Sequence, residues 1–246
     1  MELLNLSSLL ASNPYPGRGI MLGRSADNKK AVAAYFIMGR SENSRNRIFE
    51  ATEDGIRTRA YDESKMVDPS LIIYHPVRRV GEVTVVTNGD QTDTIRDSLL
   101  AGKSYIDALR TRCYEPDGPN YTPRISGVVD QDGSFCLSIL KSADGDPACS
   151  HRYFYEYDAP LAGEGRFIHT YQENAEPLPS FEGEPRRVSV SAPDAETLAS
   201  QVWASLNEDN KVSLFVQYIH LATGERETVI LNKHGEQAHA ASKVPN

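Results

Sequence analysis

The apolar residues of this chain fall in short runs separated by glycine, proline, asparagine and aspartate, a pattern typical of a strand-rich protein. In the clearest run, Ala31–Met38, every residue is apolar, which indicates a strand buried on both faces. The Asn88-Gly89 and Asp132-Gly133 pairs are turn formers, and the second lies within a predicted hairpin over Val128–Phe135. The pattern predicts strands over Gly19–Gly23, Ala31–Met38, Arg47–Ala51, Arg57–Tyr61, Leu71–His75, Glu82–Thr87, Arg124–Val129, Phe135–Leu140, Arg152–Tyr157, Phe167–Gln172, Val188–Val190, Val212–Ile219 and Thr228–Leu231.

Two regions have the apolar period of helices. In the first, Thr92–Cys113, Gly102 lies near the middle and a capping box starts at Ser104, so we expect two short consecutive helices. The first two residues of that region are its candidate N-caps. The second helix is predicted over Ser191–Leu206, with its first residue as the N-cap. Together with many strands, these helices predict an α+β layered sandwich.

No linker-like stretch or internal repeat divides the chain, so we expect one domain. The segment Glu173–Arg187 is rich in proline and glutamate and is predicted to be a long surface loop. At 246 residues, with 39% hydrophobic and 24% charged residues, the chain has the composition of an ordinary globular protein. No apolar run is long enough to cross a bilayer, and the first residues lack the basic region of a secretory signal.

The net charge of -8 argues against a general nucleic-acid-binding protein, but it leaves room for a local basic pocket that binds a small anion. Arginines are concentrated early in the chain. The three cysteines, Cys113, Cys136 and Cys149, are widely spaced and indicate reduced thiols rather than a disulfide framework. The six histidines are scattered, so no metal site is predicted.

The densest group of candidate binding residues is Gly39–Arg47, which follows the apolar run directly. It contains three arginines, two asparagines and two serines. Guanidinium and amide groups bind phosphate and the edges of planar heterocycles, although a solvated polar turn has the same composition. The residues alone leave both interpretations open.

Other candidate sites are equally ambiguous when taken singly. Thr87–Thr94 follows the apolar run Val83–Val86 and leads through a glycine-containing loop into a helix, which suits either an anion site or a plain turn with a cap. Tyr74 ends an apolar run, and Glu115 follows the predicted helices in surroundings that would raise its pKa. Gly102-Lys103-Ser104 lacks the earlier glycine of a phosphate-binding loop and is not one.

Taken together, these blocks resemble the archaeal-type IMP cyclohydrolases. The resemblance rests on Pro16–Ile20, Gly39–Arg47, Tyr74, Val85–Ile95, Tyr114-Glu115 and Thr122–Ile125, in that order and at similar spacing. It is strong from Tyr15 to about Val129 and weaker beyond. The Gly39–Arg47 loop is slightly longer here than in the family pattern.

The resemblance implies a four-layer αββα sandwich similar to the N-terminal-nucleophile hydrolase fold. It implies one domain over residues 1–246, with an N-terminal extension over 1–14 and a C-terminal tail over 232–246. The implied activity is interconversion of 5-formamidoimidazole-4-carboxamide ribonucleotide and IMP plus water in purine biosynthesis. No metal or organic cofactor, nucleic acid or membrane is implied. A cytoplasmic location is implied, and the oligomeric state stays open, a homo-oligomer included.

Residue by residue, the resemblance puts the family's catalytic Arg, Tyr and Glu on Arg47, Tyr74 and Glu115. The implied substrate-binding residues are Arg18, Arg40, Arg45, Asn46, Asn88, Thr92, Asp93 and Arg124. Two alternatives remain. The chain is either an enzyme of the same fold that acts on another amide or purine-like compound, or a non-catalytic purine-nucleotide-binding protein.

Overall fold

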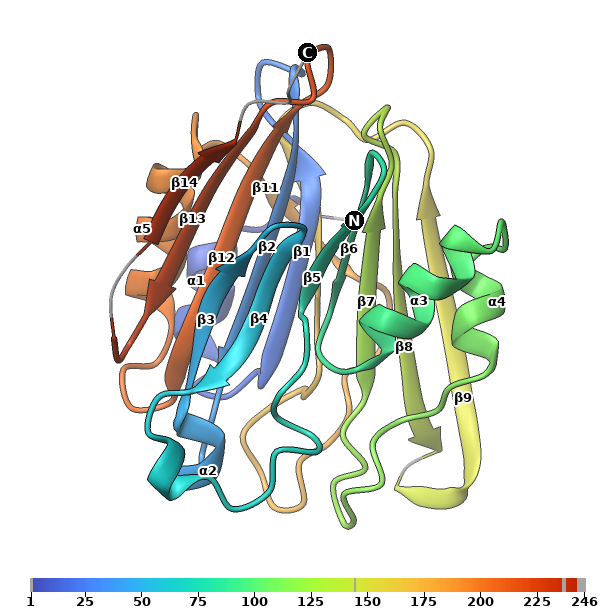
Figure 1. Ribbon diagram of the computed structural model, residues 1–246, viewed down its shortest axis with the longest axis vertical. Helices are drawn as coiled ribbons and strands as arrows, with labels where there is room; N and C mark the ends of the chain where they lie inside the picture. The colour runs from blue at the N-terminus through green and yellow to red at the C-terminus, as the bar shows by residue number, and fades with distance from the viewer. Residues whose placement is uncertain (1, 144, 236–237, 243–246) are drawn as a thin grey trace.

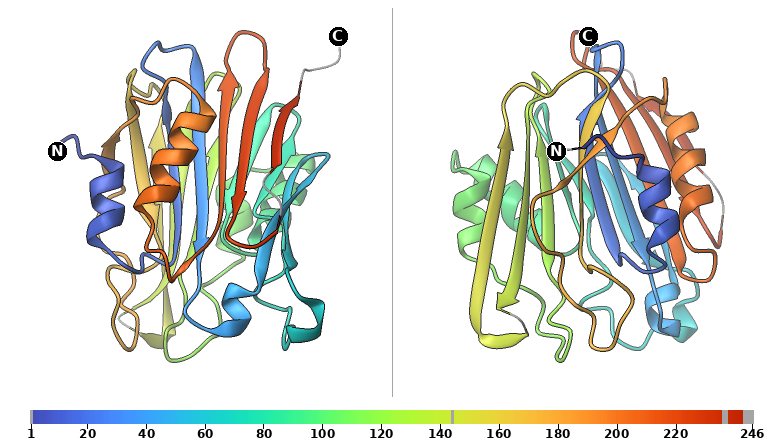
Figure 2. Two further views of the ribbon diagram at one scale, coloured as in Figure 1. Left: turned by 90° about the vertical axis from the view of Figure 1, so that its left-hand side faces the viewer. Right: turned by 180° about the vertical axis from the view of Figure 1, so that it is seen from behind.

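The computed structural model describes residues 2–143, 145–235 and 238–242. Within these ranges the chain forms two antiparallel seven-stranded sheets that pack face to face, with helices on both outer faces (Figures 1 and 2). The strand order is β11-β10-β1-β2-β12-β13-β14 in sheet A and β3-β4-β5-β6-β7-β8-β9 in sheet B. The molecule is therefore a sandwich of the α+β class.

The elements have the following bounds. Sheet A consists of β1 (Arg18–Arg24), β2 (Lys30–Met38), β10 (Glu164–His169), β11 (Arg186–Ser189), β12 (Lys211–His220), β13 (Arg226–Asn232) and β14 (Ala238–Ser242). Sheet B consists of β3 (Arg47–Thr52), β4 (Gly55–Ala60), β5 (Val77–Val80), β6 (Val83–Thr87), β7 (Arg124–Val129), β8 (Phe135–Ala143) and β9 (Asp146–Tyr157). The helices are α1 (Leu6–Ser12), α2 (Glu42–Arg45), α3 (Gln91–Leu100), α4 (Tyr105–Arg110) and α5 (Ala195–Ser205), with a 3-10 turn η1 (Glu63–Lys65).

Three apolar clusters hold the layers together. Phe49 and Phe215 belong to the cluster between the sheets. On the outer face of sheet A, α1 and α5 contribute Leu10 and Val202, and on the outer face of sheet B, α3 contributes Ile95. Since β1 and β2 lie in the middle of sheet A and are covered on both faces, nearly all of their residues are buried, which explains the unbroken apolar run of β2.

Most of the predicted elements are confirmed. The helices α3 and α4 are separate, and the capping box at Ser104 starts the second. The strands β7 and β8 form the predicted hairpin. The predicted caps are wrong for two helices, since α3 begins after Asp90 and α5 after Asp194, whose side chain accepts the capping hydrogen bond.

The strand predicted over Leu71–His75 is wrong. The backbone N–H groups of Ile72 and Ile73 both donate to the carbonyl oxygen of Pro69, which makes a turn. A short apolar run between two prolines does not extend far enough to form a ladder, and this one instead presents Tyr74 to the interior. Strand β5 was missed because two arginines stand between its two valines.

Segments near both ends of the chain belong to the sandwich. The tail expected over 232–246 contains β14, which pairs with β13, so that expectation is wrong for residues 238–242. An edge strand needs only backbone hydrogen bonds, and its composition therefore carries little signal. Within the expected N-terminal extension, α1 buries Leu6 and Leu10 against the helix layer of sheet A. Residues 1, 144, 236–237 and 243–246 lie outside the described residues.

One end of the sandwich gathers several strand termini. The strands β1 and β7 begin where β2, β6 and β10 end, because each of these neighbouring pairs is antiparallel. The strand β3 also begins there, after α2 (Figure 1, lower end). No helix in the described part of the chain is long and apolar enough to cross a membrane.

Candidate functional site

Arg47, the first residue of β3, lies fully inside the protein with an exposed fraction of 0%. Its Nε donates to the backbone oxygen of Ser44 over 2.8 Å, while neither terminal nitrogen has a hydrogen-bond partner within the described residues. Burial lowers the pKa of Arg47, and the neighbouring Arg18 guanidinium lowers it further. A buried guanidinium fork without acceptors is costly in free energy, so it is poised to bind an oxygen-bearing ligand.

Tyr74 lies in the loop before β5, and its position is fixed by β4. The Tyr74 N–H donates to Oγ1 of Thr58, and the Thr58 N–H donates to the Tyr74 carbonyl, both over 2.8 Å. The Tyr74 hydroxyl lies 2.8 Å from the Tyr35 hydroxyl, which projects from β2. Burial raises the pKa of Tyr74, while Arg47 and Arg18 act in the opposite direction. The phenol is therefore neutral and able to donate or relay a proton.

Glu115 follows α4 and is almost completely buried, with an exposed fraction of 3%. Its N–H donates to the Thr122 carbonyl over 2.9 Å, which fixes the backbone. Burial raises the pKa of Glu115 from 4.5 to about 7, although Arg18, Arg124 and Arg47 oppose this shift. A carboxyl group with a pKa near neutrality can both accept and donate a proton at physiological pH.

Arg124, the first residue of β7, stands beside Glu115. Its terminal nitrogen donates to Asp90 over 2.8 Å and to Gln91 over 2.7 Å, and lies 3.9 Å from a carboxylate oxygen of Glu115. Gly89 is needed here, because a Cβ at this position would lie 2.5 Å from the Arg124 nitrogen and 2.6 Å from the Gln91 oxygen. The glycine therefore lets the loop after β6 pass directly over this ion pair.

Arg18, the first residue of β1, is buried, and its Nε has no partner within the described residues. The preceding Gly17 has a φ of +79°, and a Cβ there would collide with Oγ1 of Thr170. Gly17 therefore lets the backbone pass close to Thr170 and Tyr171 before β1 begins. Arg18 acts electrostatically on both Tyr74 and Glu115.

The three residues predicted to be catalytic thus come together in one buried group. We call it the polar cluster, and it consists of Arg18, Tyr35, Arg47, Tyr74, Glu115 and Arg124. Its members influence one another's pKa values, and they come from both sheets at the end where strand termini gather. Acid, phenol and unpartnered guanidinium in one water-poor place form an arrangement suited to moving protons and stabilising charge on a substrate oxygen.

Three other predicted residues have their side chains engaged by the protein itself. The Asn46 amide bonds to both backbone groups of Asp62, each over 2.8 Å. The Asn88 amide bonds to the Pro123 carbonyl and the N–H of Ile125. Thr92 contacts the Thr87 hydroxyl and the Gly89 carbonyl. These residues shape the loops around the polar cluster, and direct contact with a substrate stays a prediction.

Arg40 and Arg45 lie outside the cluster. Arg40 pairs with Glu176 over 3.2 Å and stands 5.2 Å from the ring centre of Tyr15. Arg45, in α2, donates to the Gly39 carbonyl and to Asn210. The structure thus divides the arginines of the 39–47 segment into one buried residue with a free fork and two that anchor loops.

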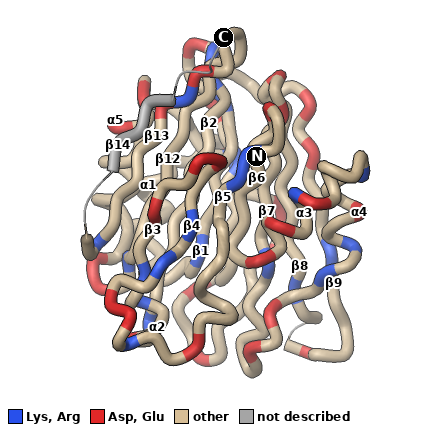
Figure 3. Tube along the Cα trace, in the orientation of Figure 1, with Lys and Arg blue, Asp and Glu red and all other residues tan. Residues whose placement is uncertain are grey.

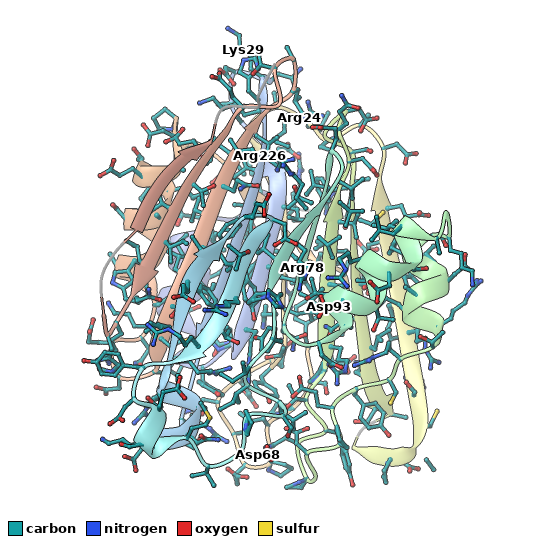
Figure 4. The ribbon with its side chains drawn as sticks, in the orientation of Figure 1. Arg24, Lys29, Asp68, Arg78, Asp93 and Arg226 are labelled. Carbon is teal, nitrogen blue, oxygen red and sulfur yellow. The ribbon has the colours of Figure 1, made fainter. Side chains whose placement is uncertain are left out.

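Asp93 lies at the start of α3 and forms an ion pair with Arg78 over 2.7 Å, as the facing side chains in Figure 4 show. It lines a pocket of about 620 Å³ that Tyr74 also borders, together with Arg57, Arg59 and other residues of β4 and the loop after it. Acidic and basic positions are interspersed along the trace in Figure 3. The described residues contain no group of three or more His, Cys, Asp and Glu arranged to hold a metal.

Sequence reasoning missed several members of this region. Tyr35 lies within the apolar run of β2, where its hydroxyl was the only signal that it differs from a core residue. Thr122 links the carboxylate of Asp117 to the hydroxyl of Tyr171, which lies 2.6 Å from the Thr122 oxygen. Tyr171 comes from the chain after β10, so sequence separation concealed its proximity to Thr122 and Arg18.

Comparisons with known proteins give one consistent result. A family model described as IMP cyclohydrolase-like protein matches residues 15–225. An IMP cyclohydrolase of Methanosphaera stadtmanae is 28% identical over 186 residues, 74% of this chain and 81% of that protein. One of Methanococcus maripaludis is 29% identical over 178 residues, 68% of this chain and 86% of that protein. Another from M. maripaludis is 33% identical over 126 residues, 49% of this chain and 61% of that protein. The matched family range contains the whole polar cluster.

Proposed function

Because this chain belongs to the IMP cyclohydrolase-like family, we propose that it interconverts 5-formamidoimidazole-4-carboxamide ribonucleotide and IMP plus water. The observation that carries the proposal is the buried Arg47 guanidinium, whose two terminal nitrogens have no partner in the described residues and which stands in the same group as Tyr74 and Glu115. The named relatives are IMP cyclohydrolases.

The reaction requires a ring closure between two groups of one molecule. The carboxamide nitrogen forms a bond to the formyl carbon, and the formyl oxygen gains negative charge as its double bond opens. The carboxamide nitrogen gives up one proton and the formamido nitrogen gives up its own. Both protons leave with the formyl oxygen as water, and a carbon–nitrogen double bond completes the ring. Proximity favours closure, so the protein must hold the nucleotide, stabilise the oxygen and transfer protons.

In this proposal Arg47 binds the formyl oxygen. Its fork offers two N–H donors to one oxygen in a place that excludes water, where a charge-assisted hydrogen bond is strong. The stabilisation grows as negative charge develops on the oxygen, so it favours the transition state over the ground state. Positive charge on Arg18 nearby acts in the same direction.

Tyr74 and Glu115 would then move the protons. Glu115 accepts the proton of the carboxamide nitrogen, a step for which a pKa of about 7 suits the carboxylate at neutral pH. Tyr74 donates a proton to the departing oxygen and takes back the proton that the formamido nitrogen gives up, while Tyr35, 2.8 Å away, positions the phenol. Glu115 passes the carboxamide proton to the same oxygen, which leaves as water. Arg124 orients Glu115 through the 3.9 Å ion pair.

The proposal extends to fold, location and substrate binding. Helix layers on both outer faces of the paired sheets support a likeness to the N-terminal-nucleophile hydrolases. Purine nucleotide synthesis makes the cytoplasm the expected location. Arg18 and Arg124 remain candidates for binding the substrate, while Arg40 and Arg45, which lie outside the polar cluster, would contribute less to binding.

The test is to incubate the purified protein with the formamido ribonucleotide, follow the ultraviolet absorbance and identify IMP by chromatography. Conversion by the native protein, with loss of conversion in Arg47→Met, is the expected result. A protein that binds the nucleotide without converting it is a non-catalytic binding protein, and one that neither binds nor converts it contradicts the proposal.

A further inference from the structure

A second polar cavity lies between the sheets toward the opposite end from the polar cluster. Its volume is about 170 Å³, and the polar residues that line it include Arg79, Thr84, Gln217, Arg226 and Thr228. In Figure 4, Arg226 lies toward the upper end of the molecule, well above Arg78 and Asp93. The register agrees, because Arg226 pairs with Ile219 of β12, which pairs with Ala31 near the start of β2.

Arg226 is the feature of this cavity that needs an explanation. Its exposed fraction is 6%, and its terminal nitrogens donate to Oγ1 of Thr84, Oε1 of Gln217 and the backbone oxygen of Glu82, over 2.7, 2.9 and 3.3 Å. These acceptors hold the guanidinium in place across the two sheets. Its Nε has no partner within the described residues. The side chain is thus buried, fixed and still short of one acceptor.

The surroundings add positive charge rather than neutralise it. Arg79 pairs with Thr84 across β5 and β6, so both side chains start on the same face of sheet B, the face toward Arg226. Burial lowers the pKa of Arg226, Arg79 lowers it further, and Glu82 opposes them. Neither arginine has a carboxylate within ion-pair distance in the described part of the chain.

The acidic residues that line the cavity do not supply the missing charge. Asp54 is held by an ion pair with Arg78 over 2.6 Å and by a hydrogen bond from Thr52 over 3.0 Å. Glu53 is exposed at the rim. A buried cation without a counter-ion is expensive, so a group that delivers negative charge to this cavity would stabilise the fold.

We propose that this cavity binds a small oxyanion of the size of inorganic phosphate, held by Nε of Arg226, the Arg79 guanidinium and the Thr228 hydroxyl. The ion would join β5 and β6 of sheet B to β12 and β13 of sheet A. The cavity is too small for a nucleotide, since drug-sized ligands occupy about 300 Å³ or more. The site is separate from the polar cluster, and it holds regardless of which substrate the protein uses.

The test is thermal unfolding of the whole protein in increasing inorganic phosphate, compared with chloride at the same ionic strength. Phosphate is expected to raise the Tm of the native protein by roughly 2–4 °C at saturating concentration. In Arg226→Met this phosphate-dependent rise should disappear, whatever the Tm of that variant without phosphate. Arg47→Met is the matched control, because it removes a buried arginine with unpaired nitrogens at the opposite end of the sheets and should keep the rise.

Two results would overturn the proposal: a rise that survives in Arg226→Met, or one that is lost in Arg47→Met instead. Where Arg226→Met does not fold, Arg79→Gln replaces it, because Arg79 is exposed and its loss should weaken phosphate affinity several-fold without unfolding the chain. Crystals soaked in selenate locate the ion directly. An anomalous peak within hydrogen-bond distance of the Arg226 Nε supports the site, and an empty cavity contradicts it.

Discussion

The two ends of the space between the sheets each bury an arginine, but they use it differently. Among the described residues, Arg47 bonds to the protein through Nε alone and keeps both terminal nitrogens free, beside Tyr74 and Glu115. Arg226 uses both terminal nitrogens on protein acceptors, and only its Nε has no partner in the described part of the chain, beside neutral Thr84 and Gln217. Burial lowers the pKa of both arginines.

The difference separates a place that can react from one that can only bind. A free guanidinium fork can bind an oxygen through two parallel hydrogen bonds, and the acid and phenol beside it can exchange protons with the same ligand. A fork fixed by protein acceptors leaves a single N–H for an ion, and the carboxylates that line its cavity are an exposed Glu53 and an Asp54 held by Arg78. Burial of a cation is therefore evidence of catalysis only where groups able to exchange protons near neutral pH face the same space.

The largest effect that this comparison predicts is that of Arg47→Met. We expect turnover of the formamido ribonucleotide to fall by about 10²–10³ or more, since one charge-stabilising donor group is removed. We also expect the protein to be as stable as before or more stable, because an uncompensated buried charge is replaced by an apolar side chain. Steady-state kinetics and urea unfolding of the same preparation measure both quantities.

Arg47→Lys is the matched variant for charge, and Arg110→Gln, on the exposed end of α4, is the control for loss of an arginine as such. Lysine keeps the charge but not the fork, so turnover should stay low. Native turnover in Arg47→Met, or a large loss of stability, would mean that Arg47 serves the fold rather than the reaction.

The second prediction concerns the pH dependence of turnover and the carboxyl of Glu115. If Glu115 accepts a proton, kcat/KM of the native protein should rise with pH and reach half of its maximum near pH 7. In Glu115→Gln this rise should disappear, and kcat should fall by about 10² or more. A Gln variant that keeps the same pH midpoint would assign the titration to another group.

The raised pKa of Glu115 also predicts that the free energy of unfolding depends on pH. Its pKa is higher in the folded protein than in the unfolded chain, so the folded state holds its proton more tightly between pH 4.5 and about 7. Stability is therefore lost as the pH rises through this range, by up to about 3 kcal/mol for a shift of this size. Glu115→Gln should match the native protein in urea unfolding at pH 4.5 and exceed it at pH 8. Equal stability at both pH values would contradict the raised pKa.

A smaller effect is expected from the pair of hydroxyl groups. Tyr74→Phe should lower kcat by about 10², because the proton donor to the departing oxygen is lost. Tyr35→Phe should lower kcat less, since in the proposed mechanism Tyr35 acts through Tyr74, and its ring contact with Phe49 is kept. The two kcat values measured side by side decide the order, and a larger loss in Tyr35→Phe would reverse the assignment.

The sequence predicted which residues lie together better than it predicted their geometry. The family resemblance singled out Arg47, Tyr74 and Glu115, which the fold brings into one buried group, although Tyr74 lies in a loop and not in the strand predicted for it. Their catalytic roles stay a prediction. The free fork of Arg47 was not foreseeable, because it depends on which acceptors the fold brings near. Nothing in the sequence indicated a binding site at Arg226. A single arginine at the start of a strand is usually exposed to solvent, and its burial becomes evident only in the folded structure.

The smallest effects on turnover should come from Arg40 and Arg45, which lie outside the polar cluster. Arg40 and Arg45 are partly exposed and bond to Glu176, Asn174 and Asn210, whose contributions in water are slight. Arg40→Ala and Arg45→Ala should therefore change KM by about fivefold or less and leave kcat near the native value, because neither guanidinium reaches the polar cluster. The longer segment 39–47 would then act as a support for Arg47. A loss of kcat in Arg40→Ala comparable to that in Tyr74→Phe would mean that Arg40 also takes part in the reaction. The distinction between the buried Arg47, with its free guanidinium, and the arginines that anchor loops would then be wrong.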